Sequence, residues 1–307
     1  DAIDILARSA RHNNAPFGGI QVVAIGDLFQ LPPVITRDAM EYYRAAYEHD
    51  NAYFFDSNVY RRADFLRYSF DLIYRQSDVA LLENLRRLRD NDLTALEFFN
   101  NCKIDDAARR ENAVIITPFR AVAERINASR LAQINAPEIT YTGELNGNFS
   151  ERDVPAPMNL TLKVGALVVF VKNGDKWHNG SMGIVRNMSA REITVELLNH
   201  THDVVSVRPE TWQKIEYSRD ENDRIQENEV GSFKQFPLNL GYAMTIHKAQ
   251  GKTLDAVIVD ISRGAFAHGQ TYVALSRTRS ASDMHIATPL RARDVIFDNR
   301  VLEFVAN

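Results

Sequence analysis

The sequence predicts an α/β chain in two parts, the second interrupted by a small, SH3-like antiparallel β-barrel. Mostly apolar runs that suit buried parallel strands lie near both ends of the chain, at Ile20–Ile25 and Leu254–Val259. Segments with helical spacing of apolar residues alternate with such runs. From about residue 160 to 235 the pattern changes to short apolar or alternating runs separated by Asn-Gly, Gly-Asp and Asn-His turns. This change predicts the β-barrel insert.

Composition sets the broad class of protein. The chain has 307 residues, of which 45% are hydrophobic and 25% charged, as in ordinary globular proteins. No apolar run approaches the length of a membrane span, and the single cysteine, Cys102, excludes an internal disulfide. We therefore expect a protein of a reducing compartment, neither secreted nor membrane-bound, with a structural Cys102 and a monomeric state favoured. The net charge of -4 requires any polyanion site to be a local basic patch.

The first α/β part begins with helical spacing over Asp1–Arg11, without a preceding cap, which suggests a piece of a longer protein. A Phe-Gly-Gly turn leads into Ile20–Ile25, expected to be a buried central strand. The loop after it carries Asp27 and Gln30 before Pro32 and Pro33. Because open α/β sheets bind ligands beyond the carboxyl ends of their strands, these two side chains are candidate ligand groups. They could equally serve only to satisfy backbone groups of the loop.

The next segments are predicted to be a helix at Asp38–His49, a short strand at Phe70–Ile73 and a helix over Val79–Asn101. Arginines 86, 87 and 89 are interpreted as the solvated face of that last helix. Arg75 differs, because it lies in the junction before the helix. From there it can reach across a cleft or simply pair with a carboxylate.

The second part opens with a strand at Ala113–Thr117 and a helix that continues to about Gln133. After the insert, a strand is expected at Ala256–Asp260, a helix at Gln270–Arg277 and a strand at Met284–Ala287. The strands expected in the insert share short length and flanking turn residues: Leu160–Val171, Met182–Asn187, Glu192–Leu198 and Asp203–Arg208.

The stretch Asn239–Asp260, NLGYAMTIHKAQGKTLDAVIVD, gathers a hydroxyl, an imidazole, an ammonium and an amide where a short helix stops at a glycine. This density of polar groups indicates a ligand. Its Gly-Lys-Thr is not a P-loop, because the position five residues before Gly251 is Ile246 and the order of helix and strand is inverted.

Five segments occur together in an order and spacing similar to those of one known family. They are GIQVVAIGDLFQLPPV, LIYRQSD, Val114–Asn127, TIHKAQGKT and TYVALSRTRS. With them the chain resembles the carboxyl-terminal two-thirds of PIF-type (petite-integration-frequency) DNA helicases, in the RecD-like branch of superfamily one. The resemblance implies a partial first RecA-like domain at 1–70 and a second RecA-like domain at 71–159 and 236–307. The SH3-like insert then occupies 160–235.

The resemblance implies roles around a nucleotide. Gln30 matches a γ-phosphate sensor, and Gly26 and Asp27 belong to the same motif. Arg75 and Arg277 match two arginines that approach the γ-phosphate, where a planar guanidinium stabilises charge on the transferring group. Gln250 and Gly251 are implied to lie near the nucleotide.

The same resemblance implies a site for single-stranded DNA. Thr245 and His247 are expected to hydrogen-bond DNA phosphates, and Lys248 to supply charge. Thr117 and Asn127 match residues near the DNA backbone, although Pro118-Phe119-Arg120 departs from the commoner Thr-Asn pattern and weakens that transfer. Trp177, in a turn of the insert, is a candidate for stacking on a strand, with a packing role as the alternative.

What the sequence lacks limits the expected activity. It contains no GxxxxGK[ST] run and no acidic pair before the Gln30 motif that could hold Mg²⁺. In the resembled family both precede the region matched here. The intact protein is therefore expected to be an ATP-dependent DNA helicase, using ATP and Mg²⁺ on single-stranded, forked or structured DNA in repair, replication or recombination. This chain alone is expected to be inactive as an ATPase.

Two alternatives remain open from the sequence. The chain could be a non-catalytic module that binds single-stranded DNA, or part of a nucleotide-dependent switch that does not translocate. The expected compartment is the cytoplasm of a bacterial-type cell or, in a eukaryote, the nucleus or mitochondrion.

Overall fold

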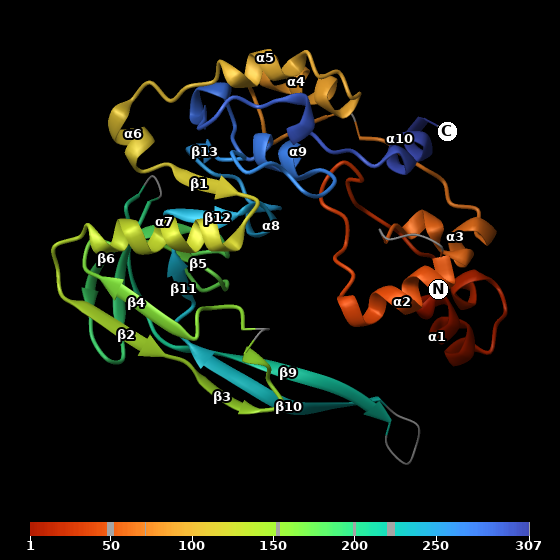
Figure 1. Ribbon diagram of the computed structural model, residues 1–307. Helices are drawn as coiled ribbons and strands as arrows, with labels where there is room; N and C mark the ends of the chain where they lie inside the picture. Colours follow the sequence, from red (N-terminus) through yellow and green to blue (C-terminus); the bar gives the residue numbers. More distant parts are fainter. Residues whose placement is uncertain (48–51, 71, 152–153, 199–200, 220–224, 307) are drawn as a thin grey trace. The chain divides into compact units, whose positions relative to one another are not determined.

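A computed structural model describes residues 1–47, 52–70, 72–151, 154–198, 201–219 and 225–306 (Figure 1). The backbone forms two compact units. Unit 1 contains residues 1–107 and 246–307, and unit 2 contains residues 108–245. The chain thus passes from unit 1 to unit 2 and back, and the return falls between Thr245 and Ile246, inside the TIHKAQG motif. This division follows the packing of the backbone and does not test the predicted domain boundaries.

Unit 1 is built mainly from short helices. Its first part contains α1 (Ala2–Arg11), η1 (Pro16–Gly19), α2 (Arg37–Tyr47), η2 (Phe54–Asp56), α3 (Asn58–Arg62), α4 (Val79–Arg89) and α5 (Ala95–Asn100). Its second part contains α8 (Ile246–Ala249), β13 (Val257–Val259), α9 (Gln270–Leu275), η4 (Ala281–Asp283), β14 (Met284–Ile286), η5 (Ala292–Asp294) and α10 (Asn299–Ala306). The strands β13 and β14 pair in parallel, as a strand–helix–strand unit requires.

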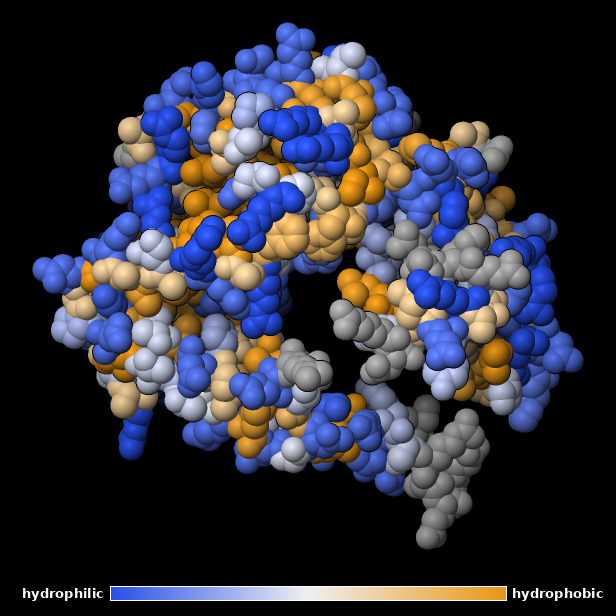
Figure 2. Space-filling model, in the orientation of Figure 1, coloured by the Kyte–Doolittle hydropathy of each residue, from blue (hydrophilic) through white to orange (hydrophobic). Residues whose placement is uncertain are grey.

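The strand expected at Ile20–Ile25 is not formed. The segment is neither helix nor strand, and its apolar side chains are exposed, with Val23 at 74% and Ile25 at 88%. A strand is ordered by hydrogen bonds to neighbouring strands, and no described strand pairs with this segment. Other apolar side chains of unit 1 are also exposed, including three on α1, and Figure 2 shows orange hydrophobic residues at the surface among hydrophilic ones.

Two further predictions in unit 1 are wrong in detail. The expected strand at Phe70–Ile73 is absent at 70, 72 and 73, and residue 71 lies outside the described part. The helix expected over Val79–Asn101 is two helices, α4 and α5. The break occurs where Asn91 adopts a left-handed φ of 59° and the Asp92 carboxylate accepts the backbone N–H of Thr94 at 3.0 Å. The helix predicted at Asp38–His49 is α2 as far as residue 47, and residues 48 and 49 are not described.

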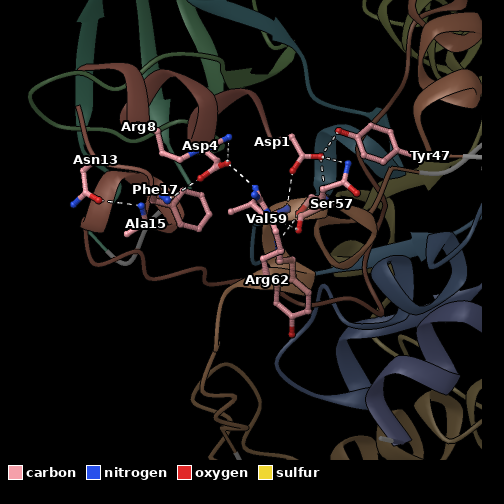
Figure 3. A network of polar contacts seen from close by, with 12 residues as sticks. Asp1, Asp4, Arg8, Asn13, Ala15, Phe17, Tyr47, Ser57, Val59 and Arg62 are labelled. Carbon is pink, nitrogen blue, oxygen red and sulfur yellow. Dashed lines mark hydrogen bonds and ion pairs between the residues drawn. The ribbon is translucent and has the colours of Figure 1, made fainter. Parts of the chain in front are cut away.

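Two carboxylates at the start of α1, that of the N-cap residue Asp1 and that of Asp4, connect the first helices of unit 1 (Figure 3). Asp1 accepts the backbone N–H of Val59 at 2.8 Å and the hydroxyl of Tyr47 at 2.8 Å. Asp4, only 1% exposed, accepts the N–H of Phe17 at 2.8 Å and pairs with Arg8 at 3.0 Å and Arg62 at 3.1 Å.

Burial raises the pKa of Asp4, but the Phe17 N–H and the two arginines outweigh burial and leave that pKa below its usual value. The buried side of α1 is therefore polar, and its carboxylates fix η1 and α3 in place of an apolar stripe.

The helix α6 (Ala107–Glu111) lies at the start of unit 2, and the α/β portion of this unit continues with β1 (Val114–Thr117), α7 (Arg120–Ala132) and β12 (Ala243–Thr245). β1 and β12 are parallel, with Thr117 opposite Thr245, and α7 packs against both. Asn127 on α7 donates to the Ala243 carbonyl at 2.9 Å and accepts the Ala243 N–H at 2.8 Å. One amide side chain thus completes the backbone hydrogen bonds of one residue of β12.

Antiparallel sheets confirm the all-β region expected at 160–235, although the run expected at Leu160–Val171 is divided into two strands and two further strands lie before residue 159. The all-β part of unit 2 includes these two strands as well. Its strands are β2 (Glu138–Thr142), β3 (Glu144–Gly147), β4 (Asn159–Lys163), β5 (Leu167–Phe170), β6 (Met182–Met188), β7 (Ile193–Leu197), β8 (Val204–Val207), β9 (Glu210–Arg219), β10 (Ile225–Gln235) and β11 (Leu238–Leu240). A five-stranded sheet runs in the order β11-β5-β6-β7-β8, and β2 pairs with β4. The strands β4, β7 and β8 and the first part of β6 alternate buried and outward residues around one core, which explains the period-two sequence signal, whereas β5 is buried along its whole length.

The strands β9 and β10 pair along a long antiparallel ribbon that was not predicted from the sequence (Figure 1), and β3 pairs with the last residues of β10, so that the sheet order is β3-β10-β9. Their sequence is mostly polar, because apart from the base of the ribbon their side chains are exposed, so the alternating signal is weak. At the base, Trp212 stacks on the buried Phe233 with ring centroids 5.6 Å apart. The other tryptophan, Trp177, stacks on Phe170 at 4.7 Å and donates its indole N–H to the Lys172 carbonyl. These contacts favour the packing role for Trp177.

No helix of the described residues combines the length and hydropathy needed to cross a bilayer. Cys102 is a free, buried thiol, and burial raises its pKa to about 11. It is a structural residue, as predicted.

Candidate functional site

A cavity of about 260 Å³ in unit 1 collects several of the predicted site residues. Its walls come from the loop after residue 26, the junction before α4, α4 itself and α9. The lining residues are Asp27, Gln30, Leu72, Ile73, Tyr74, Arg75, Gln76, Leu85, Arg86, Arg89, Tyr272 and Ser276. Three arginines face a single carboxylate, so the cavity favours an anion.

The amide of Gln30 is held between two other polar side chains. Its Nε2 donates to Asp27 Oδ2 at 3.0 Å, and its Oε1 accepts from Gln250 Nε2 at 3.4 Å. The second oxygen of Asp27 accepts the Phe29 N–H at 3.1 Å, which closes a turn around the loop. The loop and the residue that follows α8 are therefore joined through Gln30.

The backbone of this loop is positioned by the segment before α9. His268 is 4% exposed, and its Nδ1 accepts the Asp298 N–H at 2.7 Å. Its Nε2 therefore carries the proton and donates to the Leu28 carbonyl at 2.7 Å. At Gly269, with φ of 72°, a Cβ would lie 2.5 Å from the Phe29 carbonyl oxygen. Only glycine permits this approach of the two backbones.

Arg75 is positioned by the two polar residues that follow it. Gln76 is buried and donates to the carbonyls of Ser276 at 3.1 Å and Thr278 at 3.2 Å, which the end of α9 leaves unpaired. Asp78 caps α4 through the Leu81 N–H and also accepts the Ala281 N–H at 2.9 Å. Burial raises the pKa of Asp78, but these hydrogen bonds outweigh it and lower the pKa. The junction is thus fastened to the end of α9, and Arg75 lines the cavity.

The guanidinium of Arg277 lies outside the cavity wall and is fully buried. Its Nε donates to Val273 O at 2.6 Å, and its NH1 donates to Ala249 O and Lys252 O at 3.4 and 3.2 Å. Burial, with a further contribution from Arg75, lowers the pKa of Arg277 to about 10. In this arrangement Arg277 joins α8 to α9, and contact with a ligand requires its side chain to move.

Sequence comparison identifies relatives along the whole chain. It is 31% identical over 315 residues to the ATP-dependent DNA helicase Pif1 of Bdellovibrio bacteriovorus, covering 98% of this chain and 65% of the relative. It is 30% identical to human PIF1, covering 46% of that protein. No family model matches the chain.

Structure comparison agrees. A Bacteroides Pif1 bound to single-stranded DNA superimposes with a TM-score of 0.75 at 31% identity, covering 100% of this chain and 71% of that one. The chain belongs to the Pif1 helicase family. A Bacteroides Pif1 in complex with ADP-AlF4 and the Pif1 of Candida albicans give TM-scores of 0.78 and 0.77, at 30% and 28% identity and with 71% and 72% of those chains covered. This Pif1-family chain spans 65% of the length of the Bdellovibrio helicase and 46% of the length of human PIF1.

The remaining nucleotide residues predicted for this Pif1-family chain are two glycines. A Cβ on Gly26 would meet no atom within 4 Å, and its φ is not positive. Gly251 has a φ of 77° and ends α8, so it supplies the left-handed residue that stops the helix. Neither glycine lines the cavity.

Three of the residues expected near DNA, Thr245, His247 and Lys248, lie around the unit boundary in the sequence, and the other two lie on β1 and α7. Thr117 is buried and lies opposite Thr245 in the parallel register of β1 and β12. The amide of Asn127 is engaged with Ala243, as described above. His247 and Lys248 are exposed on α8. Desolvation of the imidazole lowers the pKa of His247 even so. The structure thus brings Thr117 and Thr245 together.

The described residues do not fit a resident Mg²⁺ ion. Asp27 is the one carboxylate of the cavity, and both its oxygens accept hydrogen bonds from the loop. No cluster of three or more His, Cys, Asp or Glu residues suited to a metal occurs in the described ranges.

Arg89 lines the cavity, although the sequence predicts that Arg86, Arg87 and Arg89 form the solvated face of their helix. That interpretation is confirmed for Arg86, which is exposed although it also lines the cavity, and is wrong for Arg89, which is only partly exposed. The spacing along the helix carries a signal for Arg89, because it lies four and eight residues beyond the buried Leu85 and Leu81, on the same face of α4.

Proposed function

We propose that this chain is part of an ATP-dependent DNA helicase that translocates along single-stranded DNA, in the 5′ to 3′ direction, and unwinds forked or otherwise structured duplexes. The observation that supports this most directly is the cavity of unit 1. It combines Gln30 and Arg75, residues far apart in sequence, with the polar groups that a phosphate chain needs.

In this proposal the cavity receives the terminal phosphates of ATP. Gln30 has one amide proton beyond its bond to Asp27, and Arg75 makes only a long contact of 3.5 Å with the Ser276 carbonyl. Both side chains can therefore turn polar hydrogens toward an anion without breaking a strong hydrogen bond. We propose that Arg277 is released from its buried position when both phosphate and DNA are bound.

Coupling to DNA is proposed to run through the TIHKAQG motif. Gln250 contacts Gln30, while Thr245, His247 and Lys248 lie just before it along the chain. The passage from unit 2 to unit 1 falls within the same motif. A change at the nucleotide can therefore alter how the preceding residues hold a DNA backbone, with Thr117 and Asn127 supporting the strand that ends at Thr245.

We propose that these 307 residues alone do not hydrolyse ATP, because no GxxxxGK[ST] run cradles the phosphates and the cavity lacks a free carboxylate for Mg²⁺. The intact protein is proposed to act in a compartment that contains DNA, either the bacterial cytoplasm or, in a eukaryote, the nucleus or mitochondrion. Repair, replication and recombination are the processes that need such strand separation.

A chimaera tests the proposal. The aligned region of the Bdellovibrio relative is replaced by this chain, and unwinding is measured on duplexes with a 5′ or a 3′ single-stranded tail. We expect ATP-dependent separation of the 5′-tailed duplex, and loss of ATP hydrolysis in the matched chimaera carrying Arg75→Gln. ATP hydrolysis without strand separation would instead favour a nucleotide switch. DNA binding without hydrolysis would favour a simple binding module.

A further inference from the structure

Arg89, at the end of α4, has an environment that the roles described above leave unexplained. Its Cζ lies 4.5 Å from the centroid of the Phe29 ring, and the residue lines the cavity. In the part of the chain that the structure describes, Arg89 makes this ring contact but no hydrogen bond or ion pair. Its polar hydrogens therefore have no described protein acceptor, in a cavity whose one carboxylate is already engaged.

Three arginines of unit 1 differ in how their donors are used. Arg277 directs its guanidinium at backbone carbonyls and the Ser276 hydroxyl. Arg75 makes one long contact, and Arg89 makes none to a described acceptor. A buried or half-buried guanidinium without an acceptor is costly, and an anion in the cavity removes that cost.

Phe29 gives Arg89 a fixed place. The ring is 5% exposed and packs edge-on against Phe297 at 5.9 Å, so it cannot move aside easily. A guanidinium over an aromatic face keeps its charge and its donors while its flat side is covered. Phe29 directly precedes Gln30, so the contact of Arg89 with the Phe29 ring also connects α4 to the loop that carries the Gln30 amide.

The pKa of Tyr272, a residue of the cavity wall, depends on the charged groups around it. Burial and then Asp27 raise its pKa, whereas Arg89, Arg277 and Arg75 lower it. Arg89 is thus close enough to act electrostatically on the same wall as Arg75.

We propose that Arg89 is a phosphate-contacting residue of this cavity, acting beside Arg75 and oriented by Phe29. This inference rests on the proposed function, which assigns a nucleotide polyphosphate to the cavity. Arg89 would then be a second guanidinium, beside that of Arg75, that can contact phosphate while Arg277 remains hydrogen-bonded to backbone carbonyls.

The test uses the 307-residue chain and inorganic tripolyphosphate, with binding measured by calorimetry at low ionic strength. Arg89→Gln is expected to weaken binding by about tenfold or more, the usual effect of losing a charged hydrogen bond. Arg89→Lys should give an intermediate loss, because it keeps the charge but not the planar fork. Arg61→Gln is the matched control, since Arg61 is exposed on α3 and does not line the cavity. Equal binding by Arg89→Gln and wild type would overturn the role of Arg89 and leave the phosphate cavity standing.

A second measurement needs no substitution and remains decisive if a variant fails to fold. Tripolyphosphate should protect Arg89 and Arg75 of the wild-type chain, but not Arg61, from modification by phenylglyoxal, as read by mass spectrometry. Protection of Arg75 without Arg89 would overturn the inference. If tripolyphosphate neither bound nor protected either arginine, the cavity itself would be refuted as a phosphate site, and the role of Arg89 with it; the chimaera tests the helicase function separately.

Discussion

Replacing Gly269 by alanine should displace the loop that carries Gln30. The Cβ would lie 2.5 Å from the Phe29 carbonyl oxygen and 2.7 Å from the Gln30 carbonyl oxygen, both backbone atoms. The left-handed φ of 72° adds about 1–2 kcal/mol for a residue with a Cβ. Relieving the clash by moving the backbone adds about 1–3 kcal/mol, the usual cost of overpacking. The expected loss in free energy of unfolding of unit 1 is therefore about 2–5 kcal/mol.

Gly264 provides a matched control in the same connection. Its φ is 82°, but a Cβ there would meet its nearest described atom, an oxygen of Asp294, only at 3.9 Å. Gly264→Ala should cost about 1–2 kcal/mol from backbone strain alone. The difference between the two variants measures the close approach of the backbones.

Urea unfolding followed by circular dichroism gives the global effect, and hydrogen exchange of residues 26–31 gives the local one. Gly269→Ala should speed exchange of the Gln30 amide, which donates to the Asp27 carbonyl at 3.2 Å, while Gly264→Ala leaves it unchanged. Equal stability losses with equal exchange in the two variants would refute the assignment of Gly269 as the residue that permits the contact.

Three other predictions concern single polar side chains. His268→Ala should cost about 2–4 kcal/mol, because it leaves a half-buried carbonyl of Leu28 and a half-buried N–H of Asp298 unpaired. Nitrogen NMR should find the wild-type proton on Nε2, and a proton on Nδ1 would contradict the geometry. The ionised Asp4 stabilises the folded protein above the ordinary carboxyl pKa of 3.8, and wild type loses this stability as pH falls through the lower folded pKa; Asp4→Asn should remove it. The free energies of unfolding of wild type and variant should therefore converge at low pH. Curves that stay parallel as pH falls would argue against this role of Asp4. Asn127→Ala should cost about 1–3 kcal/mol by unpairing both backbone groups of Ala243; the two tryptophans, both in unit 2, report its unfolding, and an unchanged midpoint would make the amide dispensable for folding.

The order of motifs along the chain was enough to identify the family and the α/β class with an all-β insert. Each motif is a short run whose polar residues follow an apolar strand or end a helix, and such patterns are local in sequence. The placement of β1, α7, β6, β7, β8 and β14 agreed with prediction within a few residues for the same reason. Gln30 and Arg75 could be selected from motif matches, and the structure brings them to one cavity.

Tertiary structure determined the features that depend on contacts between residues far apart in the sequence. An apolar run such as Ile20–Ile25 becomes a strand only when neighbours supply hydrogen bonds, and no described strand does so. The donors of Arg277 are engaged by carbonyls from α8 and α9, whereas Arg89 on α4 faces the cavity, a distinction made by residues far away in sequence. The sequence by itself thus determined the family and the chemical types at the site. Packing determined which of those groups are free to meet a ligand, because hydrogen-bond acceptors come from whichever segments the fold places nearby.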